Sequence, residues 1–341
     1  MQDGRGTPPK QSLRASFEHD GPVTVVVRAA TDLGLKRQNN EDSYGCWLPD
    51  DPAERERRGL LLAVADGMGG VKGGEVASRI TVETVMRAYG ESPGTDVAQD
   101  LQAALTTANR MVHRESEARP DLNGMGTTCT AAVVRGREMY VAHVGDSRAY
   151  LVRSGKAQQL THDHSLVGQL VRDRQLTVEQ ARTDPRRNVV TRSVGISEEV
   201  DVDAERIAEP MRDGDVLMLC TDGLHGLVRD DELGAAVAGR DLDQACERLV
   251  GLAKQRGGPD NITVILARAE SPTNGEAVPP SASAERLGRA GSNPTLAMLL
   301  VAGLMLLLLA LGALGWLVVR MTLQPHTQGV SLSADAGTRT T

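Results

Sequence analysis

Short apolar runs that end at Gly or Asp occur in groups along this sequence, and pairs of helical patterns separate the groups. Runs of about 4–8 residues rich in Val, Ile, Leu and Tyr with such ends are typical of β-strands. Seven runs fit this description: Val23–Arg28, Leu60–Ala65, Thr130–Val134, Met139–Val144, Ala149–Val152, Val216–Cys220 and Ile262–Leu266. Strands that follow one another without an intervening helix favour antiparallel pairing. The grouping therefore predicts an α+β fold with largely antiparallel sheets covered by helices, and not a doubly wound parallel fold.

Four longer segments show the spacing of apolar residues that is typical of helices. They are Gly74–Tyr89, Asp96–Glu117, Asp230–Ala238 and Leu242–Arg256. The second segment has the clearest apolar face, which consists of Val97, Leu101, Leu105, Ala108 and Val112. We expect each pair of helices to cover one face of a sheet.

Composition divides the chain into parts. We expect a polar N-terminal tail at 1–22, a folded domain at 23–270, a flexible linker rich in Pro, Ser, Ala and Gly at 271–294, a membrane-spanning helix at 295–320 and a short tail at 321–341. With 40% hydrophobic residues, the chain has ample material for a buried core, so wholesale disorder is excluded.

The segment Leu296–Val319 is 24 residues long and contains no charged or strongly polar side chain. As a helix it would span about 36 Å, against about 30 Å for the hydrocarbon core of a bilayer. Because it is apolar all round and lies beyond the linker, a buried core helix is the weaker interpretation. The sequence predicts a single transmembrane helix.

Two features favour a cytoplasmic position for the large domain. No apolar segment follows Met1, which argues against a cleaved signal peptide. The four cysteines, Cys46, Cys129, Cys220 and Cys246, show no CxxC spacing and are expected to be reduced, buried thiols. We therefore expect a single-pass protein of the cell membrane with its catalytic domain in the cytoplasm and a short external tail.

The charge balance argues against a nucleic-acid partner. The chain has 38 Lys and Arg against 45 Asp and Glu, a net charge of −7, and no run of Lys or Arg forms a basic stripe. Aromatic residues make up only 2% of the chain, which disfavours a platform for stacking single-stranded bases.

An aspartate stands within two residues of a glycine at an end of a predicted strand in four places. These are Asp66, Asp146, Asp222 and Asp260. One such Asp-Gly pair usually marks a turn. Four carboxylates fixed at strand ends, with glycines that allow close backbone approach, suit hard divalent cations such as Mg²⁺ and Mn²⁺. These cations keep several waters, so the pattern supports a metal-dependent hydrolase or phosphotransfer site.

Seven short motifs follow one another along the chain. They are Arg37-x-x-Asn40-Glu41-Asp42, Asp66-Gly-Met-Gly-Gly70, Gly126-Thr-Thr128, Gly145-Asp-Ser-Arg148, Asp163-His-Ser165, Thr221-Asp-Gly223 and Gly258-Pro-Asp-Asn261. In this order they resemble the metal-dependent Ser/Thr protein phosphatases of type 2C (the PPM family) in their bacterial form. The resemblance covers about Val23 to Ala269. It implies a four-layer sandwich in which two antiparallel β-sheets are flanked by antiparallel helix pairs.

The resemblance also implies a centre with two Mn²⁺ or Mg²⁺ ions. Asp66 matches the ligand that bridges both ions, and the backbone carbonyl of Gly67 matches a ligand of the second ion. Asp222 and Asp260 match the remaining protein ligands of the first ion. Together with Arg37, these three aspartates are the expected catalytic residues.

Four further residues take roles by the same resemblance. Glu41 and Asp42 match positions that act mainly through metal-bound waters, and Asp146 matches a ligand of a third, weaker metal ion. Arg37 matches the arginine that binds the substrate phosphate. A planar guanidinium can hold two phosphate oxygens at once, which a lysine cannot do. Taken alone, Arg37 would more often form a surface ion pair, for example with Asp32 or Glu41.

One position departs from the pattern of animal and plant members, which carry a proposed general acid, histidine, two residues after the bridging aspartate. This chain has Met68 there, and a thioether cannot donate a proton. His143, His162 and His164 are candidates by proximity to motifs, and each more often has a structural role. A metal-bound water is the other candidate.

The stretch between Leu166 and Val194 is polar and rich in arginine. In the family this region is a mobile flap beside the active site. A charged flap is usually only a solvated surface. The sharper hypothesis is that its arginines help to select phosphorylated segments by charge.

The leading hypothesis is a membrane-anchored protein phosphatase that removes phosphate from Ser or Thr residues and opposes Ser/Thr kinases, including a membrane kinase. A second hypothesis is a membrane-tethered scaffold that binds phosphoproteins without catalysis, but such a protein would be expected to lose Asp66, Asp222 or Asp260. A third is a regulator that dephosphorylates an anti-sigma-factor antagonist, although no sensor domain is visible.

Overall fold

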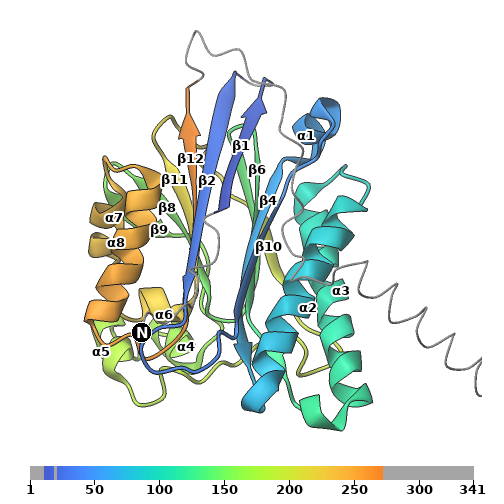
Figure 1. The fold of residues 1–341 in the computed structure, drawn as a ribbon, viewed down its shortest axis with the longest axis vertical. Helices are drawn as coiled ribbons and strands as arrows, with labels where there is room; N and C mark the ends of the chain where they lie inside the picture. The colour runs from blue at the N-terminus through green and yellow to red at the C-terminus, as the bar shows by residue number, and fades with distance from the viewer. Residues whose placement is uncertain (1–10, 19–20, 272–341) are drawn as a thin grey trace, which may run out of the picture. The chain divides into compact units, whose positions relative to one another are not determined.

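Two six-stranded antiparallel sheets face each other in the computed structural model, which describes residues 11–18 and 21–271 (Figure 1). Sheet A has the strand order β1-β2-β12-β11-β8-β9. Its strands are β1 (Gln11–Phe17), β2 (Val23–Asp32), β8 (Arg148–Arg153), β9 (Lys156–Gln159), β11 (Val216–Cys220) and β12 (Ile262–Glu270). The longest pairing joins β12 to β2 and runs from Ile262 opposite Asp32 to Glu270 opposite Thr24.

Sheet B has the order β10-β7-β6-β4-β3, with a short strand β5 paired to the end of β4. Its strands are β3 (Asp42–Trp47), β4 (Leu60–Met68), β5 (Gly126–Thr127), β6 (Cys129–Arg135), β7 (Glu138–Val144) and β10 (Asp203–Arg206). The hairpin pairs β6 with β7 and β8 with β9 account for the grouping of apolar runs along the sequence. The predicted α+β class with antiparallel sheets is confirmed.

Two helix pairs cover the outer faces of the sheets (Figure 1). Helices α2 (Gly70–Gly90) and α3 (Val97–Ala118) pack on sheet B, and α7 (Asp230–Val237) and α8 (Leu242–Gln255) pack on sheet A. The predicted apolar face of α3, from Val97 to Val112, is buried. The remaining helical segments are α1 (Pro52–Arg58), η1 (Pro120–Leu122), α4 (Leu166–Arg172), α5 (Val178–Thr183) and α6 (Asp222–His225).

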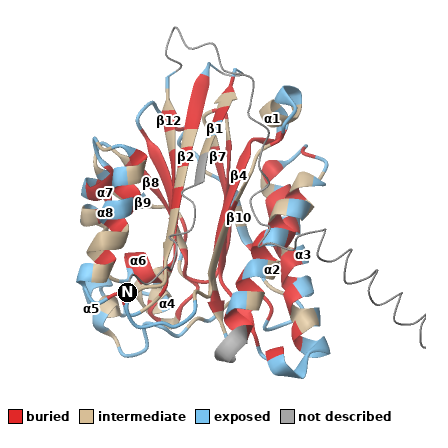
Figure 2. Cartoon of the chain, viewed as in Figure 1, coloured by how far each residue is buried: buried red, intermediate tan, exposed pale blue. Residues whose placement is uncertain are grey.

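Strand β4 shows how the layers are held together. Leu60, Leu62 and Val64 point into the core between the two sheets, whereas Leu61 and Ala63 point into the core between sheet B and its helices. Side chains alternate between the faces of a strand, so a strand buried on both faces must be apolar at every position. Figure 2 shows the same distribution, with buried residues along the strands and on the inner faces of the helices. A third core lies between sheet A and its helices, which completes four layers.

The seven predicted strands are all present, and the strands that sequence reasoning missed are informative. They include β1, β3, β9 and β10, which are the four edge strands of the two sheets. Edge strands expose more polar surface than central strands, and native proteins keep them short or polar. The sequences DAER in β10 and KAQQ in β9 therefore carry almost no hydrophobic signal.

The expected polar N-terminal tail at 1–22 requires a correction. Residues Gln11–Phe17 form β1, which pairs with β2 from Gln11 opposite Ala29 to Phe17 opposite Val23. Ala15 and Phe17 are fully buried in the core between the sheets. The folded part therefore begins no later than Gln11, because polar and apolar residues alternate along this edge strand and its apolar side enters the core.

Two other expectations concern cysteines and membrane spans. All four cysteines are free thiols; Cys129, Cys220 and Cys246 are buried, and Cys46 is half-buried. Within residues 11–18 and 21–271, no helix has the length and apolar character needed to cross a bilayer. The predicted span Leu296–Val319, the linker and the C-terminal tail lie outside the described residues.

The burial of β1 predicts that Phe17→Ala lowers the free energy of unfolding by about 3–5 kcal/mol, because it removes a large side chain from a packed core. Urea denaturation followed by circular dichroism measures the effect. Arg14→Ala in the same strand is the matched control, since the Arg14 side chain is exposed and its ion pair with Glu270 is long, at 3.4 Å. A loss as small as that of the control would mean that β1 contributes little to the fold.

Candidate functional site

Carboxylates from both sheets meet at one end of the sandwich. In sheet B, Asp42 at the start of β3 lies directly opposite Asp66 near the end of β4. In sheet A, Asp222 follows β11 as the first residue of α6, and Asp260 lies two residues before β12. Asp146 lies in the turn between β7 and β8 and is buried. The four strand-end aspartates that the sequence singled out are thus joined by a fifth, Asp42.

Asp42 links the two sheets through hydrogen bonds. The hydroxyl of Thr221 donates to its Oδ2 at 2.9 Å, and the hydroxyl of Thr263 donates to the same oxygen at 2.7 Å. Both threonines belong to sheet A or its margin, whereas Asp42 belongs to sheet B. The other oxygen, Oδ1, is buried and has no hydrogen-bond partner, and the same is true of Oδ1 of Asp222.

The backbone at Asp66 is fixed by the next segment of sheet B. Its N–H donates to Thr128 Oγ1 at 2.9 Å, and its carbonyl accepts from the Thr128 N–H at 2.9 Å and the Thr127 hydroxyl at 2.7 Å. A Cβ atom at the following residue, Gly67, would lie 2.1 Å from the carbonyl oxygen of Gly74 and 2.6 Å from that of Glu41. Only glycine fits there, which explains the Asp-Gly pair at this strand end.

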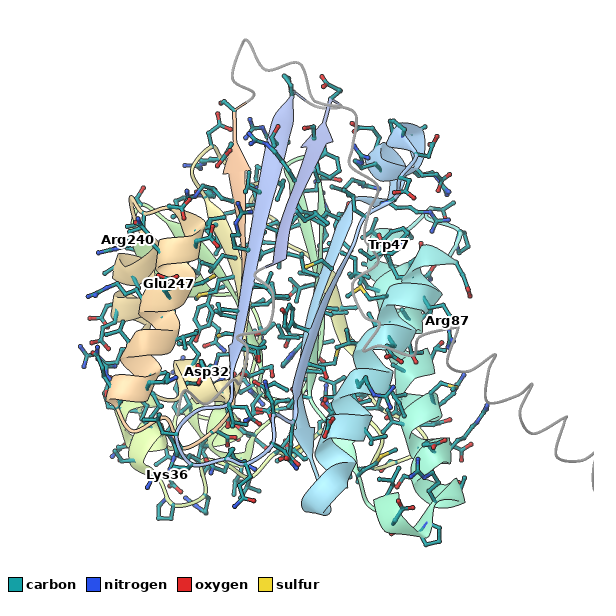
Figure 3. All side chains as sticks on the ribbon, in the orientation of Figure 1. Asp32, Lys36, Trp47, Arg87, Arg240 and Glu247 are labelled. Atoms are coloured by element: carbon teal, nitrogen blue, oxygen red, sulfur yellow. The ribbon has the colours of Figure 1, made fainter. Side chains whose placement is uncertain are left out.

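Arg37 lies at the rim of the carboxylate cluster. Its guanidinium contacts Asp260 Oδ2 at 2.8 Å and Glu41 Oε2 at 3.1 Å, and its side chain is 44% exposed. The loop that carries it follows β2, and Figure 3 shows Asp32 and Lys36 in this region, at the end of the sandwich where α6 lies. The ion pair with Glu41 that the sequence suggested is present, together with one to Asp260.

Asn261 holds this loop in place. Its Nδ2 donates to the carbonyl oxygens of Leu33 and Asn39, each at 3.0 Å, and its Oδ1 accepts from the Glu41 N–H at 2.8 Å. Asn261 is itself 2% exposed. The loop with Arg37 and the segment with Asp260 are therefore fixed to each other by a buried amide, which the sequence analysis quoted in a motif without assigning a role.

The electrostatics of the cluster oppose full ionisation. Burial raises the pKa of Asp66 well above its ordinary value, and the charges of Asp42, Asp222, Asp146 and Asp260 add to the effect. Burial, followed by the charge of Asp260, raises the pKa of Asp222, and a hydrogen bond with Asp66 acts in the opposite direction.

Two more aspartates and a glutamate show the same effect. Burial raises the pKa of Asp42 to about 7, although its hydrogen bonds from two threonines oppose the change. Burial and the charge of Asp222 raise the pKa of Asp146 to about 8. Burial raises the pKa of Glu41 despite the nearby Arg37. Carboxylates that repel one another in a dry site have a strong affinity for a cation that would neutralise them.

The residues present fit divalent metal ions. Within the described part of the chain, no group of three or more His, Cys, Asp or Glu side chains already stands as a coordination shell. The support comes instead from the buried, unpartnered oxygens of Asp42 and Asp222. A donor set of carboxylate oxygens suits Mg²⁺ or Mn²⁺.

The structure separates the three candidate histidines. His143 is buried, with Nδ1 at 2.9 Å from the Thr130 hydroxyl and Nε2 at 3.1 Å from the His162 carbonyl, and burial lowers its pKa to about 3. His164 Nδ1 accepts from the Gly145 N–H at 3.1 Å, and Nε2 lies 3.1 Å from Asp203 Oδ2. Both rings have structural roles. His162 is exposed and lines the same cavity as Asp146, Asp222 and Asp260.

Sequence reasoning missed two residues of the site, Thr263, which donates to Asp42, and His225. His225 is buried in α6, and its Nε2 donates to the carbonyl oxygen of Asp146 at 2.9 Å. It thereby fixes the turn that carries Asp146 to the helix that begins with Asp222. Its position three residues after Asp222, on the next turn of a short helix, is the one signal in the sequence that could have indicated this.

Comparison with known proteins places this chain in a family. The family described as protein phosphatase 2C matches residues 36–266, which include each of the site residues named above. The chain therefore belongs to the protein phosphatase 2C family, in its bacterial form.

Individual relatives agree with this assignment. The serine/threonine protein phosphatase PstP of Mycobacterium tuberculosis is 38% identical over 247 residues, which are 72% of this chain and 45% of that protein. The serine/threonine phosphatase stp of Listeria monocytogenes is 36% identical over 245 residues, which are 70% of this chain and 94% of that protein. The chain thus spans less than half the length of the first relative and nearly all of the second.

Solved structures show the same fold. The crystal structure of the catalytic domain of PstP in complex with two manganese ions is 35% identical, has a TM-score of 0.62, and is aligned over 73% of this chain and 99% of that one. The structure of the Streptococcus agalactiae serine/threonine phosphatase has a TM-score of 0.65 at 33% identity, over 72% of this chain and 99% of that one.

The carboxylate cluster predicts that Mn²⁺ stabilises the protein. At a concentration 100 times its Kd, Mn²⁺ adds about 2.7 kcal/mol, which corresponds to a rise in Tm of about 5–10 °C for a domain of this size. Asp66→Asn should abolish most of this rise, and in chelator it should melt no lower than the wild type because one buried like charge is gone. Differential scanning fluorimetry with EDTA or Mn²⁺ measures both effects.

The matched control for this experiment is Asp201→Asn, which makes the same chemical change at an exposed residue away from the cluster. It should keep the full Mn²⁺-dependent rise. A rise of normal size in Asp66→Asn would exclude Asp66 as a metal ligand.

Proposed function

We propose that this chain is a metal-dependent protein phosphatase that hydrolyses phosphoserine and phosphothreonine monoesters in proteins. The observation that carries the proposal is the buried cluster of carboxylates from both sheets with a half-exposed arginine at its rim. Family membership and the names of its relatives support the substrate class.

Asp66, Asp222 and Asp260, with the carbonyl of Gly67, are the proposed ligands of two Mn²⁺ or Mg²⁺ ions. When bound, two such ions lower the pKa of water and neutralise charge on phosphoryl oxygens. The bound manganese in the structure of the PstP catalytic domain supports this choice of metal for the present chain. Asp146 is the proposed ligand of a third, weaker ion, and Glu41 and Asp42 are proposed to act through waters.

Arg37 is the proposed phosphate-binding residue. Its guanidinium is already oriented by Asp260 and Glu41, which raise its pKa, so it stays charged at any working pH. The fixed fork of its donors can hold two phosphate oxygens and orient the scissile bond. Asn261 keeps the Arg37 loop at a constant position relative to Asp260.

The leaving hydroxyl needs a proton, and Met68 cannot supply one. Of the three histidines, only His162 is exposed to the cavity beside the aspartates, so it is the proposed donor among the side chains. Water is the alternative donor. His143 and His164 are not proposed, because both of their ring nitrogens are engaged.

The alternative functions have weaker support. A phosphoprotein-binding scaffold does not need a full set of buried acidic side chains, and the chain retains Asp66, Asp222 and Asp260. A regulator that acts on an anti-sigma-factor antagonist would use the same site, and the relatives' names, serine/threonine phosphatases, favour the general activity. Phosphoproteins and a membrane Ser/Thr kinase are the proposed partners.

Activity itself tests the proposal. The full chain should hydrolyse a phosphothreonine peptide in Mn²⁺ and lose this activity in EDTA.

Arg37→Ala should raise KM by about tenfold to a hundredfold, the value of a charge-assisted hydrogen bond, with little change in the Mn²⁺-dependent Tm. Arg37→Lys should recover only part of the loss. Lys36→Ala, at the exposed neighbouring residue, is the control. An unchanged KM in Arg37→Ala would leave Arg37 as a surface ion pair.

We also propose that Leu296–Val319 anchors the protein in the cell membrane, with the catalytic domain in the cytoplasm. The full chain should then sediment with membranes and resist extraction by high salt, whereas a chain that ends at residue 270 should be soluble and active. Protease added to intact cells should reach no more than the tail after Arg320. Digestion of the phosphatase domain under these conditions would reverse the topology.

A further inference from the structure

A cavity of about 420 Å³ lies between the carboxylate cluster and the segment 165–188. One wall carries Asp146, Asp222 and Asp260. The opposite wall is formed by α4 and α5, with Val167, Val171, Val178 and Ala181, and Leu227 adds to the apolar surface. Its size is within the range of about 300–1,000 Å³ that is usual for ligand pockets, at the lower end. A pocket with a charged wall and an apolar wall therefore opens beside the proposed phosphate site.

The segment that forms the outer wall is held at several points. Ser165 and Val190 form an isolated antiparallel bridge, and Thr127 and Val194 form another. The side chain of Ser165 caps α4, and Thr177 with Gln180 forms a capping box at the start of α5. These contacts give the cavity a defined shape without a bound partner, and preorganised pockets lose little free energy in ordering on binding.

The arginines that line the cavity are not equally neutralised. Arg148 is paired with Asp163 through two hydrogen bonds of 2.8 and 2.6 Å, and Arg182 lies 3.7 Å from Asp230. Arg172 donates only to the backbone carbonyl of Asp163.

The fourth arginine of this lining, Arg187, is exposed. Its backbone N–H donates to the carbonyl of Asp184 at 3.1 Å, but its side chain makes no hydrogen bond or ion pair with the described residues. Together with Arg172 it leaves uncompensated positive charge at the outer wall. That charge is complementary to an acidic side chain.

The exposed large hydrophobic side chains are a further feature of the surface near this cavity. Val178, which lines the cavity, is 57% exposed, and Val189 and Ile196, which follow the segment in the sequence, are 46% and 52% exposed. Leu35, two residues before Arg37, is 58% exposed. Of these four side chains, Val178 is the one that lines the cavity, and Leu35 belongs to the loop that carries Arg37. An exposed apolar side chain in the lining of a cavity suits an apolar group of a ligand.

We propose that the cavity is a specificity pocket for protein substrates, which takes an apolar side chain near the phosphorylated residue while Arg172 and Arg187 contact an adjacent acidic side chain. The pocket is continuous with the carboxylate wall, so a chain whose phosphate lies beside Arg37 can place a neighbouring residue in it. This inference rests on the proposed phosphatase function and adds the class of sequence that the enzyme prefers.

The test compares phosphothreonine peptides that differ at one position. Each peptide has a Ser and Ala background, with Leu, Asp, Lys or Ser placed in turn at each of the three residues on either side of the phosphothreonine. With the full chain and Mn²⁺, Leu should raise kcat/KM about tenfold over Ser at one or more positions, and Asp should exceed Lys at a neighbouring one. Equal rates for all peptides would overturn the proposal.

The variants distinguish the pocket from the rest of the surface. Val178→Asp should reduce the ratio of kcat/KM for the Leu and Ser peptides to less than about twofold, and the ratio cancels any change in overall activity. Val189→Asp, one residue beyond the segment and outside the cavity lining, should keep the ratio. Arg172→Ala combined with Arg187→Ala should reduce the preference for Asp over Lys, and Arg174→Ala should not. An unchanged ratio in Val178→Asp would overturn the assignment of the pocket.

Hydrolysis of p-nitrophenyl phosphate separates this inference from the proposed function. This substrate has no peptide to place in the pocket, so it reports on the metal and phosphate site alone. Its hydrolysis together with equal rates for all peptides would overturn the pocket and leave the phosphatase function intact. No hydrolysis of this substrate or of any peptide in Mn²⁺ would overturn both.

Discussion

The repulsion among aspartates drawn from two different sheets is the constraint on which the rest of the structure depends. Asp42 and Asp66 belong to sheet B, whereas Asp222 and Asp260 follow or precede strands of sheet A. Their mutual charge and their burial raise the pKa values of Asp42, Asp66 and Asp222. The arrangement is unfavourable by itself, so it can exist only because other interactions hold the two sheets together.

Those interactions lie mainly in the core between the sheets, which is built from alternating positions on both of them. Leu60, Leu62 and Val64 of β4 lead directly to Asp66, so a strand that is buried along most of its length also fixes a carboxylate near its end. Burial of apolar side chains is the largest favourable term in folding. The free energy gained by packing thus offsets the repulsion among the clustered carboxylates, and a bound metal ion would reduce that repulsion. Functional sites are commonly unfavourable for stability in this way.

The sequence predicted the central elements of the fold and the members of the site better than the connections between them. Buried strands such as β4 and β11 are apolar at every position, so composition alone reveals them. Edge strands share their backbone hydrogen bonds with one neighbour and face solvent, which leaves little pattern in β9 or β10. Polar contacts over long distances in the sequence, such as that of Thr221 with Asp42, follow only from the packing of the two sheets.

The site was predicted as a set of residues because strand-end aspartates stand next to glycines, and at Asp66 and Asp222 the glycine has a steric reason. A Cβ at Gly67 would overlap the carbonyl oxygen of Gly74, and one at Gly223 would overlap that of Asn261, at 1.8 Å. What the sequence could not provide is the role of uncharged partners. Asn261 and His225 each make their contacts to backbone carbonyls of distant segments, and a residue type alone does not specify such a contact.

The outer wall of the cavity is tied to the carboxylate cluster by one buried ion pair. Arg148 lies two residues after Asp146, and its guanidinium is paired with Asp163 at the start of the arginine-rich segment. Arg172 on α4 donates to the carbonyl of the same Asp163. Loss of one partner from a buried pair leaves an uncompensated charge, which is strongly destabilising. The position of α4 relative to Asp146 is therefore set by electrostatics, whereas the side chains that α4 and α5 present to the cavity are free to differ. The ion pair fixes the distance between the carboxylate cluster and the outer wall. The proposed metal ligands and the proposed substrate-contacting side chains are different residues, so the second set can change while the first stays the same.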